Sequence, residues 1–136
     1  MNEEDIEAAL GTVLLNNLAG LPSSVAWPNV DHNGAVPFLQ VLFTGGERIG
    51  GALKGGSQIL KSNGLMQINI VTEQGGGADP ANAYADIVAG LYPEGTRLSI
   101  TGGEITVLAP PSIRKGFEGD KGWIVPVVIR YGAAKV

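Results

Sequence analysis

The first segment of the chain carries apolar residues at helical spacing. Steps of four residues connect Ile6, Leu10 and Leu14, and two further apolar residues fall on the same helical face. Four acidic residues crowd the first turns, where negative charge suits the helix dipole. The pattern predicts an amphipathic helix over roughly residues 3–18. Its apolar face consists of Ile6, Leu10, Val13, Leu14 and Leu18.

A second helix is predicted from its start signal and its apolar positions. Asp79 is a good N-cap, and Pro80 suits the first helical position. Pro93 and Gly95 follow the last apolar residue, so the helix is expected to end at 91 or 92. The apolar face is expected to consist of Ala83, Tyr84, Ile87, Val88 and Leu91.

Apolar runs and alternation predict the first strands. A short extended piece at 24–28 comes first. The run at 38–43 is apolar on nearly both faces, which favours a strand covered on both sides. Residues 65–72 alternate between apolar and polar, as a half-buried strand does.

Three more strands are predicted in the second half of the chain. The strands 98–101 and 104–108 meet at Gly102-Gly103, which is a hairpin signal. A loop is expected at 110–122. In the last strand, 123–131, every second residue is apolar or aromatic: Trp123, Val125, Val127, Ile129 and Tyr131.

Pro126 lies inside this last strand. Proline has no N–H to donate to a central ladder, so we expect 123–131 to lie at a sheet edge or to carry a bulge at this residue.

Residues 45–63 contain three glycine pairs and no apolar periodicity of their own. A stretch this long without a core is unusual inside a compact domain. The segment is either a flexible loop or an extended hairpin arm that orders against something else. The apolar residues Ile49, Leu53, Ile59 and Leu60 favour the arm, because a solvated loop does not need them.

The predicted elements define a fold class. Most neighbouring strands are joined by short turns, so the sheet should be mainly antiparallel, with both amphipathic helices packed on one face. We therefore expect an α+β two-layer fold with a long hairpin arm or loop. A chain of 136 residues is expected to form one domain, 1–136.

Composition adds a reason to expect partners. Hydrophobic residues make up 44% of the chain and charged residues 16%, below the usual quarter. This apolar surplus is more easily explained if partner subunits cover part of the surface. With a net charge of −4, the chain lacks the excess of basic residues that is typical of proteins that bind the phosphate backbone of nucleic acids.

No targeting segment is expected. The acidic start lacks the basic region of a secretory signal, and no apolar run reaches the roughly 18 residues of a membrane span. The absence of cysteine fits synthesis in a reducing cytoplasm.

Few residues of the chain match known catalytic motifs. The single histidine, His32, lies in a polar turn, and no G-x-S-x-G segment supplies a nucleophile. The glycines at 75–77 precede a helix, but no Lys-Ser/Thr pair follows them as in a Walker loop. The carboxylates lack the apolar setting that raises a catalytic pKa. We therefore expect no enzyme, no cofactor and no metal site.

The order of segments resembles the tail terminator-like proteins of long-tailed bacteriophages and of gene transfer agents. The most family-like stretch is VAWPN at 25–29, which follows a helix ending in LAGLP at 18–22. The other matching segments are PFLQV at 37–41, GLMQINI at 64–70, the helix AYADIVAGL at 83–91 and GWIVPVVIRY at 122–131.

This resemblance implies a structural virion protein without catalytic residues. Such a protein forms a ring, usually a hexamer, that caps the head-proximal end of the tail tube, stops its growth and offers a surface to head-completion proteins. Its partners would be further copies of itself, the tail tube protein and the head-completion protein. DNA would pass through the lumen without specific binding, and we expect that lumen to be acidic or neutral.

Assembly is expected to use the arm and the last strand, the expected sheet edge. The candidate interface residues are Arg48, Lys54, Ile59, Lys61, Trp123, Arg130 and Tyr131. The alternative reading is a module that binds a small ligand or a peptide in a pocket lined by Trp27, Trp123 and Tyr131.

Overall fold

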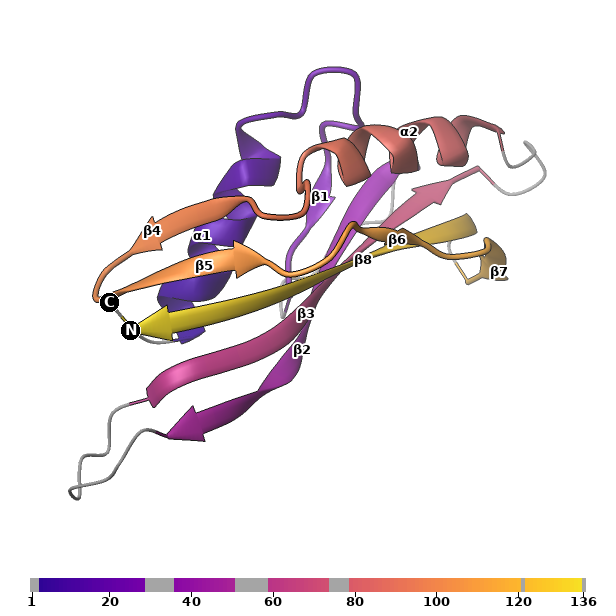
Figure 1. Ribbon diagram of the computed structural model, residues 1–136. Coiled ribbons are helices and arrows are strands. Elements are labelled where there is room, and N and C mark those ends of the chain that lie inside the picture. The colour runs from indigo at the N-terminus through magenta and orange to yellow at the C-terminus, as the bar shows by residue number, and fades with distance from the viewer. Residues whose placement is uncertain (1–2, 29–35, 51–58, 74–78, 121, 136) are drawn as a thin grey trace.

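The computed structural model describes five stretches of the chain, which Figure 1 shows as helices, strands and coloured connections. These stretches are residues 3–28, 36–50, 59–73, 79–120 and 122–135. Within them the chain forms two helices and eight strands. The elements are α1 (Glu3–Leu15), β1 (Val25–Ala26), β2 (Phe38–Gly50), β3 (Ile59–Thr72), α2 (Asp79–Gly90), β4 (Arg97–Ile100), β5 (Gly103–Val107), β6 (Ser112–Ile113), β7 (Phe117–Gly119) and β8 (Gly122–Lys135).

The strands form one curled mixed sheet in the order β1-β2-β3-β8-β5-β4. The two-residue strand β1 runs parallel to β2, and the strand pairs that follow it are antiparallel. With the two helices, the sheet makes an α+β fold, as the sequence predicts.

The strand β8 lies inside the sheet, so the expectation of a sheet edge at 123–131 is wrong. On one side β8 pairs with β3 along most of its length, from Trp123↔Thr72 to Ala134↔Lys61. On the other side it pairs in turn with β7, β6 and β5. The strands β6 and β7 lie in the segment 110–122, where the sequence analysis expected only a loop.

The backbone around Pro126 shows how a central strand accommodates a proline. Ile113 pairs with Val127 and Phe117 with Ile124, so four steps along the β6–β7 segment match three steps along β8. Residues 114–116 opposite Pro126 belong to no strand, and the Pro126 carbonyl accepts a hydrogen bond from the Arg114 N–H at 2.8 Å. On its other side β8 pairs with β3 through Asn69↔Pro126 without a register shift, so the described strand has neither the edge position nor the bulge at Pro126 that the sequence analysis expected.

One large hydrophobic core joins the sheet to both helices. Alternate residues of the central strands point into it, as the period of two predicts. The helix α1 contributes the residues that its periodicity marked. The fully buried members include Ile6, Leu10, Leu14, Met66, Ile68, Ile70, Val125, Val127 and Ile129.

The buried face of α2 differs from the predicted one. Ala81, Ala85 and Val88 are fully buried, whereas Ala83 is exposed and Ile87 is 39% exposed. The sequence of α2 offers two overlapping apolar stripes. The stripe with the smaller side chains faces the sheet, and small side chains let a helix approach a sheet closely.

Tyr92 connects the end of α2 to α1. Its side chain is fully buried, and its hydroxyl donates a hydrogen bond of 2.7 Å to the Leu10 carbonyl oxygen. Burial raises the pKa of the Tyr92 hydroxyl far above its ordinary value, so the hydroxyl stays protonated as a donor.

The opposite face of the sheet carries a smaller apolar cluster and a row of amides. Ala26, Phe38 and Val71 form the cluster. Beside it, the Gln67 side-chain amide donates to Asn69 at 2.8 Å, and the Asn69 amide donates to Gln40 at 3.1 Å. At the start of β2, Phe38 and Leu39 are therefore buried on opposite faces, whereas Leu42 later in the predicted run 38–43 is 38% exposed.

The strands β2 and β3 continue well beyond their predicted ends and form a long hairpin (Figure 1). Their pairing runs from Phe38↔Val71 to Gly50↔Ile59. A bulge between Thr44 and Glu47 accommodates the pair Gly45-Gly46. Where the structure describes it, the segment 45–63 is therefore a hairpin arm. Residues 51–58 of that segment lie outside the described residues.

Candidate assembly surface

The distal part of the hairpin, 45–50 with 59–63, carries three of the predicted interface residues; we call it the hairpin arm. Arg48 pairs with Ser62, Ile49 pairs with Lys61, and Ile59 pairs with Gly50. Lys54 lies outside the described residues. The arm extends beyond the rest of the molecule in Figure 1, which makes it accessible to a second protein.

Tyr131 does not lie on the surface. Its side chain is 2% exposed and belongs to the main core. A Cβ atom added to Gly64 would lie 2.5 Å from the Tyr131 hydroxyl oxygen, so the backbone of β3 is packed directly against this ring. Tyr131 therefore supports the sheet, and its assignment as a contact residue followed from the incorrect edge position of β8.

Trp123 is half-buried and holds the β7 segment onto the core. Its indole ring packs against Gly116, where an added Cβ atom would lie 2.6 Å from the indole nitrogen. That nitrogen is buried and has no hydrogen-bond acceptor among the described residues. Most of this side chain is therefore engaged within its own subunit.

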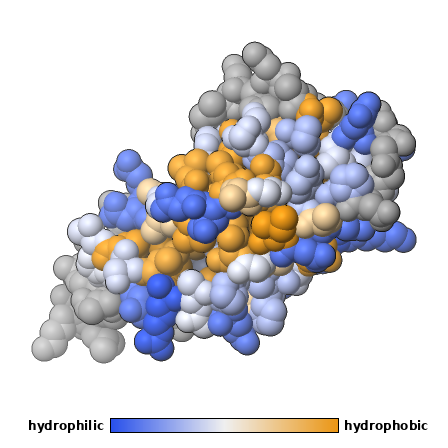
Figure 2. Space-filling model, turned by 90° about the horizontal axis from the view of Figure 1, so that it is seen from above, coloured by the Kyte–Doolittle hydropathy of each residue, from blue (hydrophilic) through white to orange (hydrophobic). Residues whose placement is uncertain are grey.

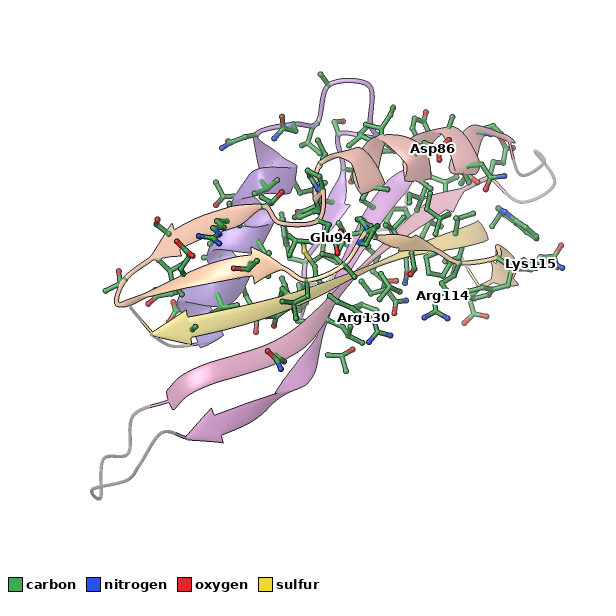
Figure 3. All side chains as sticks on the ribbon, viewed as in Figure 1. Asp86, Glu94, Arg114, Lys115 and Arg130 are labelled. Carbon is green, nitrogen blue, oxygen red and sulfur yellow. The ribbon has the colours of Figure 1, made fainter. Side chains whose placement is uncertain are left out.

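Arg130 is exposed on the face of the sheet that lies opposite the main core. It pairs with Leu65 of β3. Figure 3 shows the side chains of Arg130 and Arg114 pointing away from α2, on which Asp86 lies. Of the predicted interface residues in the last strand, Arg130 is exposed, Trp123 is half-buried and Tyr131 is buried.

A groove that the sequence analysis missed runs between α1 and the start of the hairpin; we call it the α1 groove. Its volume is about 390 Å3, and most of its lining is apolar. The ring of Trp27 packs closely against Gly11, where an added Cβ atom would lie 3.1 Å from the ring. Leu15 at the end of α1 is 51% exposed. The lining residues are Glu7, Ala8, Gly11, Thr12, Leu15, Trp27, Pro28 and Phe43.

The α1 groove lies beside an open strand edge. Phe43 of β2 belongs to its lining. The strand β1 covers β2 only at Leu39 and Gln40. Among the described residues, β2 beyond Gln40 has β3 as its one strand neighbour. An apolar groove next to an unpaired strand edge is a surface that proteins usually cover.

Further apolar side chains are exposed on several elements. Figure 2 shows hydrophobic residues gathered in a band across the view from above, with hydrophilic residues on both sides of it. The exposed large hydrophobic residues of the described chain are Leu15, Leu42, Ile87, Leu108, Ile113 and Phe117. They belong to separate elements, so more than one surface of the protein offers apolar contact area.

Acidic and basic residues are segregated along the chain. Residues 3–28 and 79–96, which contain both helices, include seven carboxylates and no lysine or arginine. All nine basic residues lie in strands or in the connections between strands. The two helical segments are therefore negative, and the positive charge belongs to the remaining segments of the chain.

The described residues hold no group of three or more His, Cys, Asp or Glu side chains placed to bind a metal ion. His32 lies outside them. Glu104 forms a loose ion pair with Arg97 at 3.9 Å, and both side chains are solvent-accessible. No helix in the described part of the chain is long and apolar enough to cross a membrane.

The alternative ligand-binding reading required a shared aromatic pocket. Trp27 lines the α1 groove, but neither Trp123 nor Tyr131 belongs to that lining. The three rings therefore do not form the pocket on which that reading depended.

Comparison with known proteins assigns a family to this fold. The family described as phage tail terminator protein matches residues 5–131, which is nearly the whole chain. The chain belongs to the phage tail terminator protein family. It is a structural protein of the virion tail, in a family without enzymatic function, and it works by assembling with other virion proteins.

Solved structures show the same fold as this tail terminator family member. One, whose title states no function, is 23% identical, with a TM-score of 0.80 over 100% of this chain and 98% of that chain. Another comes from the virion of a native gene transfer agent particle. It is 13% identical, with a TM-score of 0.58 over 98% of this chain and 96% of that chain. Among curated proteins, none matches the chain.

Proposed function

We propose that the protein forms a ring that caps the head-proximal end of a tail tube. The ring stops growth of the tube and offers the surface to which the head-completion protein binds. The family match over residues 5–131 carries this proposal. A hexamer is the expected ring, with the tail tube protein and the head-completion protein as its neighbours.

The surface of the subunit supports assembly into a ring. A ring is built from heterologous contacts, in which two different patches of the same subunit meet. The hairpin arm and the α1 groove are two such patches, and they differ in shape and in charge. A small subunit with exposed apolar residues on several elements also has area to bury against a tube and a connector.

The experiment is assembly of the purified protein on purified tail tubes, followed by native mass spectrometry and electron microscopy. The expected result is a closed ring of identical copies at one end of each tube, and tubes that no longer elongate. A protein that stays monomeric at every concentration, with tubes present, would refute the ring.

We further propose that DNA passes through the ring without being held. An acidic or neutral lumen follows from the net charge of −4, because a basic channel would bind phosphates and slow passage. Titration of assembled rings with duplex DNA at low salt should show no binding above background. Tight binding that weakens steeply with salt would contradict this prediction.

A further inference from the structure

We propose that the hairpin arm of one copy docks into the α1 groove of the next copy. This inference rests on the proposed ring and specifies its subunit contact. It commits to a second copy of this chain as the occupant of the groove.

Charge complementarity favours this occupant. The N-terminal turns of α1 carry four carboxylates, and Glu7 lines the groove itself. The segment 3–28 contains no lysine or arginine, so its formal charge is negative. The described part of the arm carries Arg48 and Lys61 against one carboxylate, Glu47. A basic hairpin and an acidic helix start attract each other, and two copies of the helix start would repel.

Apolar contacts favour the same pairing. The groove is lined mainly by apolar residues, with Leu15 half exposed at the end of α1. The sequence places Ile49, Ile59 and Leu60 on the arm. A groove of about 390 Å3 has space for a few aliphatic side chains. Filling it from another copy would remove apolar surface of both partners from water.

The geometry directs the arm to another copy. Lys61, Ser62 and Asn63 of β3 pair with Ala134, Ala133 and Gly132 of β8. This pairing ties the base of the arm to the sheet, and the ends of β2 and β3 extend beyond the other elements of the molecule (Figure 1). Each copy therefore offers one arm and one groove, which is the requirement for a heterologous contact that closes into a ring.

Disulfide trapping tests the contact directly, because the chain contains no cysteine. One chain carries Leu15→Cys in the groove, and a second chain with a different tag carries Ile49→Cys on the arm. The two are assembled together on tail tubes and oxidised. We expect a disulfide between the two different chains. Asp86→Cys, exposed on α2, replaces Leu15→Cys as the matched control and should give at least about tenfold less product.

Changing the charge of the two surfaces gives a second, independent readout. Arg48→Glu with Lys61→Glu on the arm should weaken assembly about tenfold, and so should Glu4→Lys with Thr12→Lys on α1. Combining all four changes in one chain should restore assembly. Lys115→Glu, an exposed residue between β6 and β7, changes charge away from both surfaces and should have no effect. Melting temperatures of the monomers report whether each variant is folded.

The possible outcomes separate the two proposals. Rings that form without a disulfide between the Leu15→Cys and Ile49→Cys chains would overturn the docking proposal but not the ring proposal. Rings whose assembly is unchanged by the charge variants would do the same. A chain that remains monomeric on tail tubes would overturn the ring and the docking together. Rings with the disulfide between the two chains and with rescue by the four combined charge changes would establish the contact.

Discussion

Gly64 and Gly90 lie in contrasting environments, and an added methyl group would fit at only one of them. An added Cβ at Gly64 would lie 2.5 Å from the hydroxyl oxygen of Tyr131, whose ring is 2% exposed and cannot swing aside. At Gly90, at the end of α2, nothing lies within 4 Å of the added atom.

Gly64→Ala should therefore lower the free energy of unfolding by about 1–3 kcal/mol, since the core is overpacked. Gly90→Ala serves as the control and should be neutral or stabilising by about 0.4–1 kcal/mol. Urea denaturation of both variants measures the difference. Equal midpoints for the two variants would show that Tyr131 is free to move away from β3.

The hydrogen bond from Tyr92 to the Leu10 carbonyl gives a second prediction. Tyr92→Phe removes a buried donor and keeps the ring, so it should cost about 0.5–1.5 kcal/mol of stability. Tyr84→Phe, at a half-buried position on α2, should cost less. Thermal melts followed by circular dichroism make this comparison. If both variants melt together, the bond does not contribute to holding α1 in place.

Sequence reasoning succeeded for residues whose periodicity was unambiguous. The four-residue steps of α1 and the alternation in β3 and β8 identified buried side chains correctly. Tyr131 shows where it failed. Its alternation with Val127 and Ile129 predicted burial, but the assumed sheet edge assigned it to an interface. The alternation of apolar residues predicts which face of the strand is buried. The position of the strand in the sheet depends on strand pairings, which a single sequence does not show.

At the scale of elements, strand lengths and very short strands were the hardest to predict. The strands β6 and β7 have two and three residues, too few to show any period. The glycine pairs at 45–46 and 50–51 suggested a break, whereas the chain uses the first pair for a bulge and continues the ladder to Gly50. Glycine marks permissive backbone, and the pairing partner decides whether a strand stops there.

A shortened hairpin is expected to leave folding of the subunit unchanged and to impair its assembly. Ser62 is 1% exposed and pairs with Ala133, so a deletion of 47–62 would cut into the folded sheet. Joining Gly50 to Ile59 by an Asn-Gly turn removes 51–58 and keeps every described pairing. The stability of this shortened protein should lie within about 0.5 kcal/mol of the parent, as for other surface changes.

Assembly of the shortened chain on tail tubes is the informative measurement. We expect fewer or no rings, because residues 51–58 belong to the segment 45–63 that the sequence analysis assigns to assembly. Unimpaired ring formation would show that 51–58 takes no part in the contact between copies.

At the scale of the whole molecule, the charge distribution was visible in the sequence and the α1 groove was not. A count along the chain is enough to find that both helices lack basic residues. The groove, in contrast, is made by Gly11, Trp27 and Phe43, which come from three separate segments. Only the packing of α1 against the start of the hairpin brings them together.

Contacts between an acidic and a basic surface imply a dependence on salt. The Debye length falls from about 30 Å at 0.01 M salt to about 3 Å at 1 M. The association constant of the ring should therefore fall as ionic strength rises over this range. Sedimentation velocity at a series of salt concentrations measures it. An association that strengthens with salt would indicate an interface dominated by apolar burial.

The central position of β8 also has a consequence for synthesis on the ribosome. Residues 122–135 emerge after every other strand, yet they pair with β3, β5, β6 and β7. Until they emerge, the strands β1 to β3 and the strands β4 and β5 lack the strand that joins them, and α2 lacks one of the strands against which it packs. The subunit should therefore fold only after translation has passed this strand. Incomplete polypeptides would then be unable to join a growing particle, which restricts assembly to full-length subunits.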